Sequence, residues 1–223
     1  MTDVLSQDEI NELLAAVDAA YAGGQKNSGV SDIEDYPNKF SRDQLGEISI
    51  IHEKFARIVK KSFSVQLRST INMDVASVCQ LTMGDFCRCI PTPTTLGVFN
   101  MEPLKGSAVL EIDPLITNAL IDRISGKAIS TKTPHELTDS ETIIMKGIFV
   151  SLLENLREAW SEIIDLQPRL IKIESDPKFI RLVPPAEGVV LVTLETKIEN
   201  VEGMLNFCIP YPVIEPITEK LTL

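Results

Sequence analysis

The sequence contains no long hydrophobic run, and this absence limits the classes of protein to which it can belong. None of its apolar stretches approaches the roughly 18 consecutive residues that a membrane-spanning helix needs. The segment beginning Met1-Thr2-Asp3 has neither the basic region nor the apolar core of a secretory signal peptide. We therefore expect a cytoplasmic protein without a membrane span.

Metal-binding residue types are also scarce. The chain has four cysteines and two histidines, Cys79, Cys87, Cys89, Cys208, His52 and His135. Cys87 and Cys89 form a C-x-C pair in a predicted strand, whereas structural zinc usually needs two C-x-x-C-like pairs. We expect buried, reduced thiols, with no metal and no cofactor.

Positive charge is in deficit, most of all near the N-terminus. The formal net charge is −11, and residues 1–38 contribute −7 of it through eight carboxylates and one lysine. Because nucleic-acid binding relies on a basic surface, we expect no nucleic-acid partner. An acidic tail on a nearly balanced body indicates a protein partner with a basic face.

The longest helical pattern runs from Thr138 to Ile164. Thr138 and Glu141 have the spacing of a capping box, and Pro168 follows the segment. Apolar residues recur at three- and four-residue spacing along one face, Ile144, Met145, Ile148, Leu152, Leu156, Ala159 and Trp160. The spacing predicts a helix of about six turns with one buried face.

An earlier stretch repeats this layout at a constant offset. Shifting the chain by 97 residues superposes Ile51 on Ile148 and Phe55 on Leu152, and later Gly106 on Gly203. Each half reads as a helix, several strands and a short helix entered near a proline. The offset predicts internal duplication with pseudo-twofold symmetry, the alternative being two α/β stretches that match by chance.

Between these landmarks the pattern predicts the remaining elements of the body. A helix over about 46–68 would bury the apolar residues Ile48, Ile51, Phe55, Ile58, Val59 and Val65, with His52 on its surface. Strands are predicted from Met73 to Leu81 and over 85–90, 96–101, 107–113, 169–174, 179–183, 189–199 and 203–209. Short helices follow Pro114 and Pro210. The predicted fold class is α/β, with long helices packed on a β-sheet.

The acidic tail contains a second complete helix signal. Ser6 and Glu9 form a capping box, and Ile10, Leu13, Leu14 and Val17 share one face. So short a helix is marginal alone, so it must bury this face either on its own domain or in the groove of a partner. The Gly-, Asn- and Ser-rich stretch that follows reads as a flexible linker, which favours the partner.

Several stretches resemble the FliM family of bacterial flagellar motor switch proteins. L-S-Q-D-E-I-N-E-L-L at 5–14 is similar to the family peptide L-S-Q-x-E-I-D-x-L-L, with Asn11 in place of Asp, and 40–42, 90–96 and 102–106 match family stretches. The resemblance implies three regions: a CheY-binding amphipathic peptide at 1–21, a flexible linker at 22–39 and a FliM middle domain of the pseudo-twofold, duplicated CheC-like fold at 40–223.

The resemblance also implies two binding sites. Phosphorylated CheY would be bound by the tail residues Leu5, Ser6, Gln7, Glu9, Ile10, Leu13 and Leu14. FliG would contact a loop that is G-G-x-G in the family and here comprises Ser125, Gly126, Lys127, Ala128 and Ile129. Only the first glycine is kept, and the alternative is a plain helix-terminating loop.

Further expectations follow from the same resemblance. The protein would be a non-enzymatic component of the switch (C-ring) that sets the direction of flagellar rotation in chemotaxis. It would lie at the cytoplasmic face of the inner membrane in the flagellar basal body and contact neighbouring copies of itself. FliN would bind through a C-terminal domain that this chain, which stops at Leu223, does not include.

A rival interpretation is a phosphatase of the CheC or FliY type, which has a similar fold. Such enzymes carry [DS]-x-x-x-E-x-x-N on a long helix, where the acid and the amide position a water that attacks an acyl phosphate. Ser49 and Glu53 fit the start of the pattern, but Ala56 stands at the amide position. In the second long helix Glu154 is followed three residues later by Arg157. The sequence therefore predicts no enzyme, and leaves a purely structural dimerisation domain as a third class.

Overall fold

The computed structural model describes residues 39–130 and 133–221. The predicted CheY-binding peptide and nearly all of the predicted linker lie outside the described residues. None of the helices in the two described ranges is long and apolar enough to cross a membrane.

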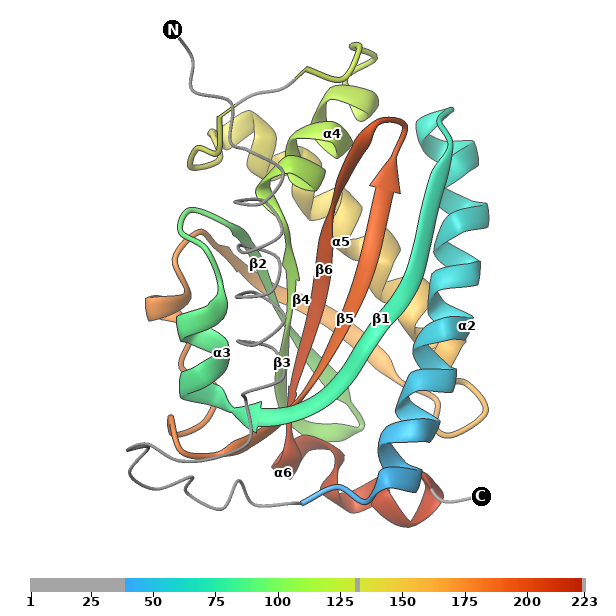
Figure 1. The fold of residues 1–223 in the computed structure, drawn as a ribbon, viewed down its shortest axis with the longest axis vertical. Coiled ribbons are helices and arrows are strands. Elements are labelled where there is room, and N and C mark those ends of the chain that lie inside the picture. The colour runs from blue at the N-terminus through green and yellow to red at the C-terminus, as the bar shows by residue number, and fades with distance from the viewer. Residues whose placement is uncertain (1–38, 131–132, 222–223) are drawn as a thin grey trace, which may run out of the picture. The chain divides into compact units, whose positions relative to one another are not determined.

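Two similar runs of elements make up the body (Figure 1). The first contains α2 (Arg42–Leu67), β1 (Ile71–Thr82), α3 (Met83–Cys89), β2 (Thr95–Glu102), β3 (Leu104–Ile112) and α4 (Pro114–Ile124). The second contains α5 (Asp139–Trp160), β4 (Gln167–Glu174), η1 (Pro177–Phe179), β5 (Gly188–Ile198), β6 (Val201–Pro210), α6 (Tyr211–Ile214) and η2 (Glu215–Leu221).

The sheet confirms the predicted duplication. Its six strands lie in the order β1-β5-β6-β3-β2-β4, and every neighbouring pair is antiparallel. Exchanging each strand for its counterpart in the other half (β1 with β4, β2 with β5, β3 with β6) reproduces the same order read backwards. The predicted pseudo-twofold α/β fold is therefore confirmed.

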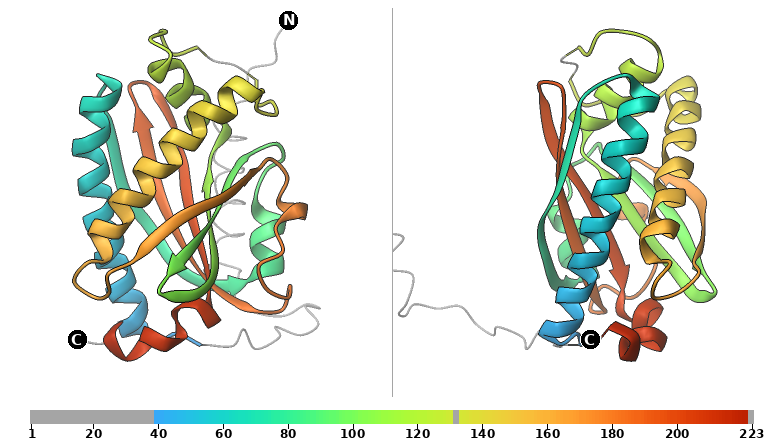
Figure 2. Two further views of the ribbon diagram at one scale, coloured as in Figure 1. Left: turned by 180° about the vertical axis from the view of Figure 1, so that it is seen from behind. Right: turned by 90° about the vertical axis from the view of Figure 1, so that its right-hand side faces the viewer.

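Helices α2 and α5 cover one face of the sheet, and α3 and η1 lie on the other (Figure 2). Both long helices begin with a capping box, formed by Ser41 and Gln44 in α2 and by Thr138 and Glu141 in α5. The main core lies between these helices and the sheet, where Phe55, Trp160 and Phe207 are completely buried. A smaller core beneath α3 contains Met83 and Phe86.

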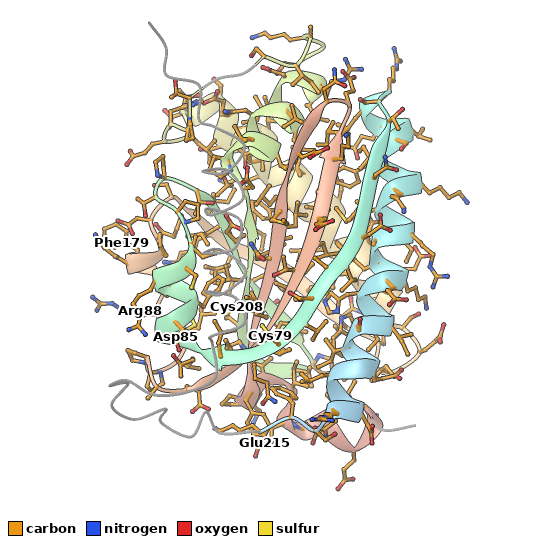
Figure 3. The ribbon with its side chains drawn as sticks, in the orientation of Figure 1. Cys79, Asp85, Arg88, Phe179, Cys208 and Glu215 are labelled. Carbon is orange, nitrogen blue, oxygen red and sulfur yellow. The ribbon has the colours of Figure 1, made fainter. Side chains whose placement is uncertain are left out.

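Two of the predicted strands are wrong. Residues 83–89 form α3 because the Thr82 hydroxyl caps the Asp85 N–H at 3.1 Å, and Met83 and Phe86, three apart, share a buried face. Residues 179–183 form no strand: η1 begins at Pro177, and its Phe179 points away from the body with 63% of its surface exposed (Figure 3). Prolines flank this segment and lack the N–H that a ladder needs.

Two predictions about the faces of α2 are also wrong. His52 is completely buried because it lies on the same broad stripe as Ile48 and Phe55 and meets the rings of Trp160 and Phe207 at 6.1 and 5.1 Å between centroids. Val65 is 77% exposed. It lies two residues, or roughly 200° around the helix, from the buried positions on either side of it.

The cysteines are free thiols, but the prediction that they are buried holds only in part. Cys208 is buried (Figure 3), and Cys87 is half-buried. Cys79 and Cys89 are exposed, the former on edge strand β1 and the latter at the end of α3. Burial raises the pKa of the Cys208 thiol well above its usual value, which keeps this thiol protonated and unreactive.

Candidate functional site

The predicted FliG-binding residues follow α4 at one end of the body, near the β5–β6 turn and the C-terminal end of α2 (Figure 1). Helix α4 starts where the Asp113 carboxylate accepts the Leu115 N–H at 2.7 Å, with Pro114 in the first turn. Its Ile116, Ala119 and Leu120 are buried in the main core. The loop therefore extends from a helix that the core holds in place.

A Schellman motif shapes the start of the loop. The Gly126 N–H donates to Arg123 O at 3.1 Å, and the Lys127 N–H donates to Asp122 O at 2.8 Å. Gly126 has a φ of +71°, which a glycine adopts without strain. The plain physical interpretation of the loop, a helix-terminating turn, is thus correct for its first residues, and it explains why Gly126 stands there.

Beyond this turn the loop is open to solvent. The side chains of Ser125, Lys127 and Ala128 are exposed, whereas Ile129 is half-buried and packs against the main core. Its exposed part offers backbone groups and one ammonium group, and no acid–base pair or nucleophile with an activating neighbour. The arrangement suits recognition by a protein surface rather than bond-breaking chemistry.

Sequence reasoning missed three residues that flank the five predicted ones. The Asp122 carboxylate accepts hydrogen bonds from Ser130 across the loop, and the Arg123 side chain donates to Leu67 O and Arg68 O at the C-terminal end of α2. The available signal was an acid–base pair at the end of a largely apolar helix. The sequence alone did not show that this acid is turned inward.

The other predicted site residues belong to the N-terminal tail. Those assigned to CheY binding all fall within residues 1–38 and lie outside the described residues. In residues 39–130 and 133–221, no three His, Cys, Asp or Glu side chains are grouped as metal ligands would be.

The long helices carry the residues that bear on the phosphatase alternative. Glu53 is exposed on α2, and Ala56, at the amide position of the phosphatase pattern, is buried. On α5 the Asn155 side chain donates to Ser62 Oγ at 3.0 Å, so this amide links the two helices. Neither helix places a carboxylate and an amide together at the spacing of the pattern.

Comparison with known proteins decides between these interpretations. Residues 41–223 match the family model described as flagellar motor switch protein FliM. The flagellar motor switch protein FliM of Treponema pallidum is 51% identical over 230 residues, an alignment that covers 100% of this chain and 67% of that protein. The chain belongs to the FliM family. The assignment favours a flagellar motor switch protein over a phosphatase of the same fold.

Solved structures agree with the FliM assignment. A crystal structure of a FliG–FliM complex from H. pylori matches with a TM-score of 0.78 and 34% identity, covering 80% of this chain and 99% of that one. Thermotoga maritima FliY matches with a TM-score of 0.72 at 17% identity, covering 82% of this chain and 97% of that one, which shows a shared fold alone. The FliM body and the FliY fold are thus variants of one duplicated architecture.

Proposed function

We propose that residues 40–223 act as a FliM middle domain that binds FliG through Ser125, Gly126, Lys127, Ala128 and Ile129. The observation that carries this proposal is an exposed loop held in a defined shape at the end of a core-anchored helix. A matching H. pylori FliM has been crystallised with FliG, which supports the same partner here. A preformed loop loses little conformational entropy on binding, which suits it to a protein contact.

The tail has a separate role in this proposal. Residues 1–21 capture phosphorylated CheY through Leu5, Ser6, Gln7, Glu9, Ile10, Leu13 and Leu14, and residues 22–39 tether the captured regulator. A linker of about 18 residues has a root-mean-square reach of roughly 20–25 Å, so capture raises the concentration of CheY beside the switch. The protein thereby couples regulator binding to the direction of rotation in the cytoplasmic C-ring, next to copies of itself.

This role requires no catalysis by the chain itself. The amide position of the phosphatase pattern is occupied by Ala56 in α2 and by Arg157 in α5, and the neighbouring Asn155 amide is engaged with Ser62. Phosphorylated CheY should therefore lose its phosphate at the same rate with and without this protein. A faster loss would reinstate the phosphatase alternative.

The binding role is tested with the purified full chain against FliG and against CheY treated with acetyl phosphate. We expect binding to both, and CheY binding only when it is phosphorylated. Replacing Leu14→Ala should weaken CheY binding roughly five- to a hundredfold without changing FliG binding or the melting temperature. A lower melting temperature with intact CheY binding would show that the tail is a structural strut.

A further inference from the structure

Two consecutive charged residues near the end of α4, Asp122 and Arg123, are largely buried although neither belongs to the predicted binding loop. Asp122 is 1% exposed and the Arg123 side chain 22% exposed, on a helix whose Ile116, Ala119 and Leu120 pack in the main apolar core. Burying a charge is costly unless hydrogen bonds compensate it. Their partners therefore indicate what the pair does.

Asp122 ties down the far side of the loop. Its Oδ2 accepts hydrogen bonds from the Ser130 N–H at 3.0 Å and from Ser130 Oγ at 2.7 Å. The main-chain oxygen of the same residue already accepts the Lys127 N–H at the near side. Asp122 therefore binds both ends of the loop, Lys127 through its main-chain oxygen and Ser130 through its carboxylate. Hydrogen bonds to a carboxylate are stronger than bonds between neutral groups.

Arg123 fixes the helix that carries the loop. Its Nη2 donates to Leu67 O at 3.1 Å and to Arg68 O at 2.8 Å, carbonyls at the C-terminal end of α2. A cation is favourable there because the helix dipole is negative at this end. Its Nε also lies 3.6 Å from Glu199 Oε1 in the β5–β6 turn, and this carboxylate accepts the Ser69 hydroxyl at 2.7 Å.

We propose that Asp122 and Arg123 are positioning residues that hold the loop in its binding shape. The proposal rests on the FliG-binding function proposed above and names the residues outside the loop on which the affinity depends. Asp122 sets the path of the loop relative to α4, and Arg123 sets α4 relative to α2 and the β5–β6 turn. Because the shape is fixed before binding, FliG binding does not have to supply the ordering free energy.

The first test measures whether the Asp122–Ser130 hydrogen bonds order the loop when FliG is absent. In the chain without FliG, Ser130→Ala removes the bond from the hydroxyl, and Asp122→Ala removes both bonds between Asp122 and Ser130. Amide hydrogen exchange over residues 125–130 should accelerate in both variants, more in Asp122→Ala. Asp122→Asn keeps an acceptor oxygen and should exchange more slowly than Asp122→Ala. Ser140→Ala, an exposed serine in the first turn of α5, is the matched control and should exchange like wild type.

The second test measures FliG affinity in the same proteins. Ser130→Ala should weaken binding about three- to tenfold and Asp122→Ala more, with Asp122→Asn between wild type and Asp122→Ala. Arg123→Lys should also weaken binding because an ammonium cannot span both α2 carbonyls and Glu199. Arg157→Lys, in the last turn of α5 and paired with Asp165 at 3.0 Å, is its control and should bind like wild type.

The outcomes distinguish the two proposals. Unchanged exchange in Ser130→Ala and Asp122→Ala would show that the Asp122–Ser130 hydrogen bonds do not hold the loop, independently of the result for FliG binding. Faster exchange with unchanged FliG affinity would overturn the positioning role. If wild type itself does not bind FliG, the proposed function fails, and the exchange rates still decide whether Asp122 orders the loop.

Discussion

The two halves of the body, residues 42–124 and 139–221, share one order of elements but end differently. The first half ends in α4, an eleven-residue helix, whereas the second ends in the short α6 and η2. Counterparts of Asp122 and Arg123 at the 97-residue offset are Glu219 and Lys220, and both are exposed. Duplication preserved the apolar core of both halves, whereas the inward-facing polar pair occurs only in the half that precedes the proposed binding loop.

The core shows the same divergence at the places where the long helices meet the sheet. Phe149 of α5 packs directly on Gly97 of β2, where a Cβ would lie 2.4 Å from Phe149 Cε1. The counterparts in the other half are His52 and Leu194, a smaller ring and a larger strand residue. The larger side chain is on the helix in one pair and the strand residue is larger in the other, so the two halves of the core are packed differently.

The largest expected effect comes from Gly97→Ala. The added methyl group would overlap a completely buried ring, and the variant should lose roughly 3 kcal/mol of unfolding free energy. Combining it with Phe149→Leu should cost less than the sum of the two single changes. Urea denaturation measures all three variants.

Gly147→Ala, at an exposed position of α5, is the control for this change. A Cβ added to Gly147 would meet nothing within 4 Å, so alanine should stabilise the helix by roughly 0.5–1 kcal/mol. Equal destabilisation by both substitutions would contradict the packing of Phe149 on Gly97.

Two buried titratable groups should make opposite contributions to the pH dependence of stability. Burial lowers the pKa of His52 from 6.5 to about 4, against a hydrogen bond between Nδ1 and Ile48 O. Burial raises the pKa of Glu111 from 4.5 to about 7, although Thr94 and Asn206 donate to its carboxylate. Between pH 6.5 and 4.5 the unfolded chain gains a proton at His52 and the folded chain holds one at Glu111, so the two contributions nearly cancel.

Removing either group should reveal the contribution of the other to the pH dependence of stability. Relative to wild type, Glu111→Gln should lose roughly 3 kcal/mol of unfolding free energy as the pH falls from 7.5 to 4.5, because only wild type is stabilised by taking up the Glu111 proton. His52→Phe should gain stability relative to wild type as the pH falls from 6.5 towards 4. Denaturant titrations across this range measure both differences, and parallel curves for all three proteins would refute the assignment.

The smallest expected effect compares the two helix starts, which occupy equivalent positions. Ser41→Ala and Thr138→Ala each remove a hydroxyl that accepts a hydrogen bond, from the Gln44 N–H at 3.2 Å and from the Glu141 N–H at 3.4 Å. Each should cost about 1 kcal/mol of unfolding free energy. Thermal denaturation of the two variants should give similar shifts, and a clearly larger loss for one would show that the two caps are not equivalent.

Sequence patterns predicted those parts of the fold that local periodicity determines. The long helices, the capping box of α5 and the 97-residue repeat follow from residue spacing, whereas the first long helix was predicted from about residue 46 and begins earlier, at Arg42, with a capping box of Ser41 and Gln44. The burial of His52 depends on Trp160 and Phe207, which are more than 100 residues away in the chain. The Asp122–Ser130 tie depends on the direction in which a polar side chain turns, and spacing does not specify this.

The central claim, that FliG binds the loop that follows the specialised first half, is tested most directly by the FliG dissociation constant of two matched variants. Ala128→Arg places a bulky cation in the exposed loop, and Ala186→Arg places the same group in an exposed loop of the second half. Isothermal titration calorimetry on the full chain should show at least about tenfold weaker binding for Ala128→Arg and less than about a twofold change for Ala186→Arg. Unchanged binding in Ala128→Arg, or an equal loss in both variants, would contradict the claim.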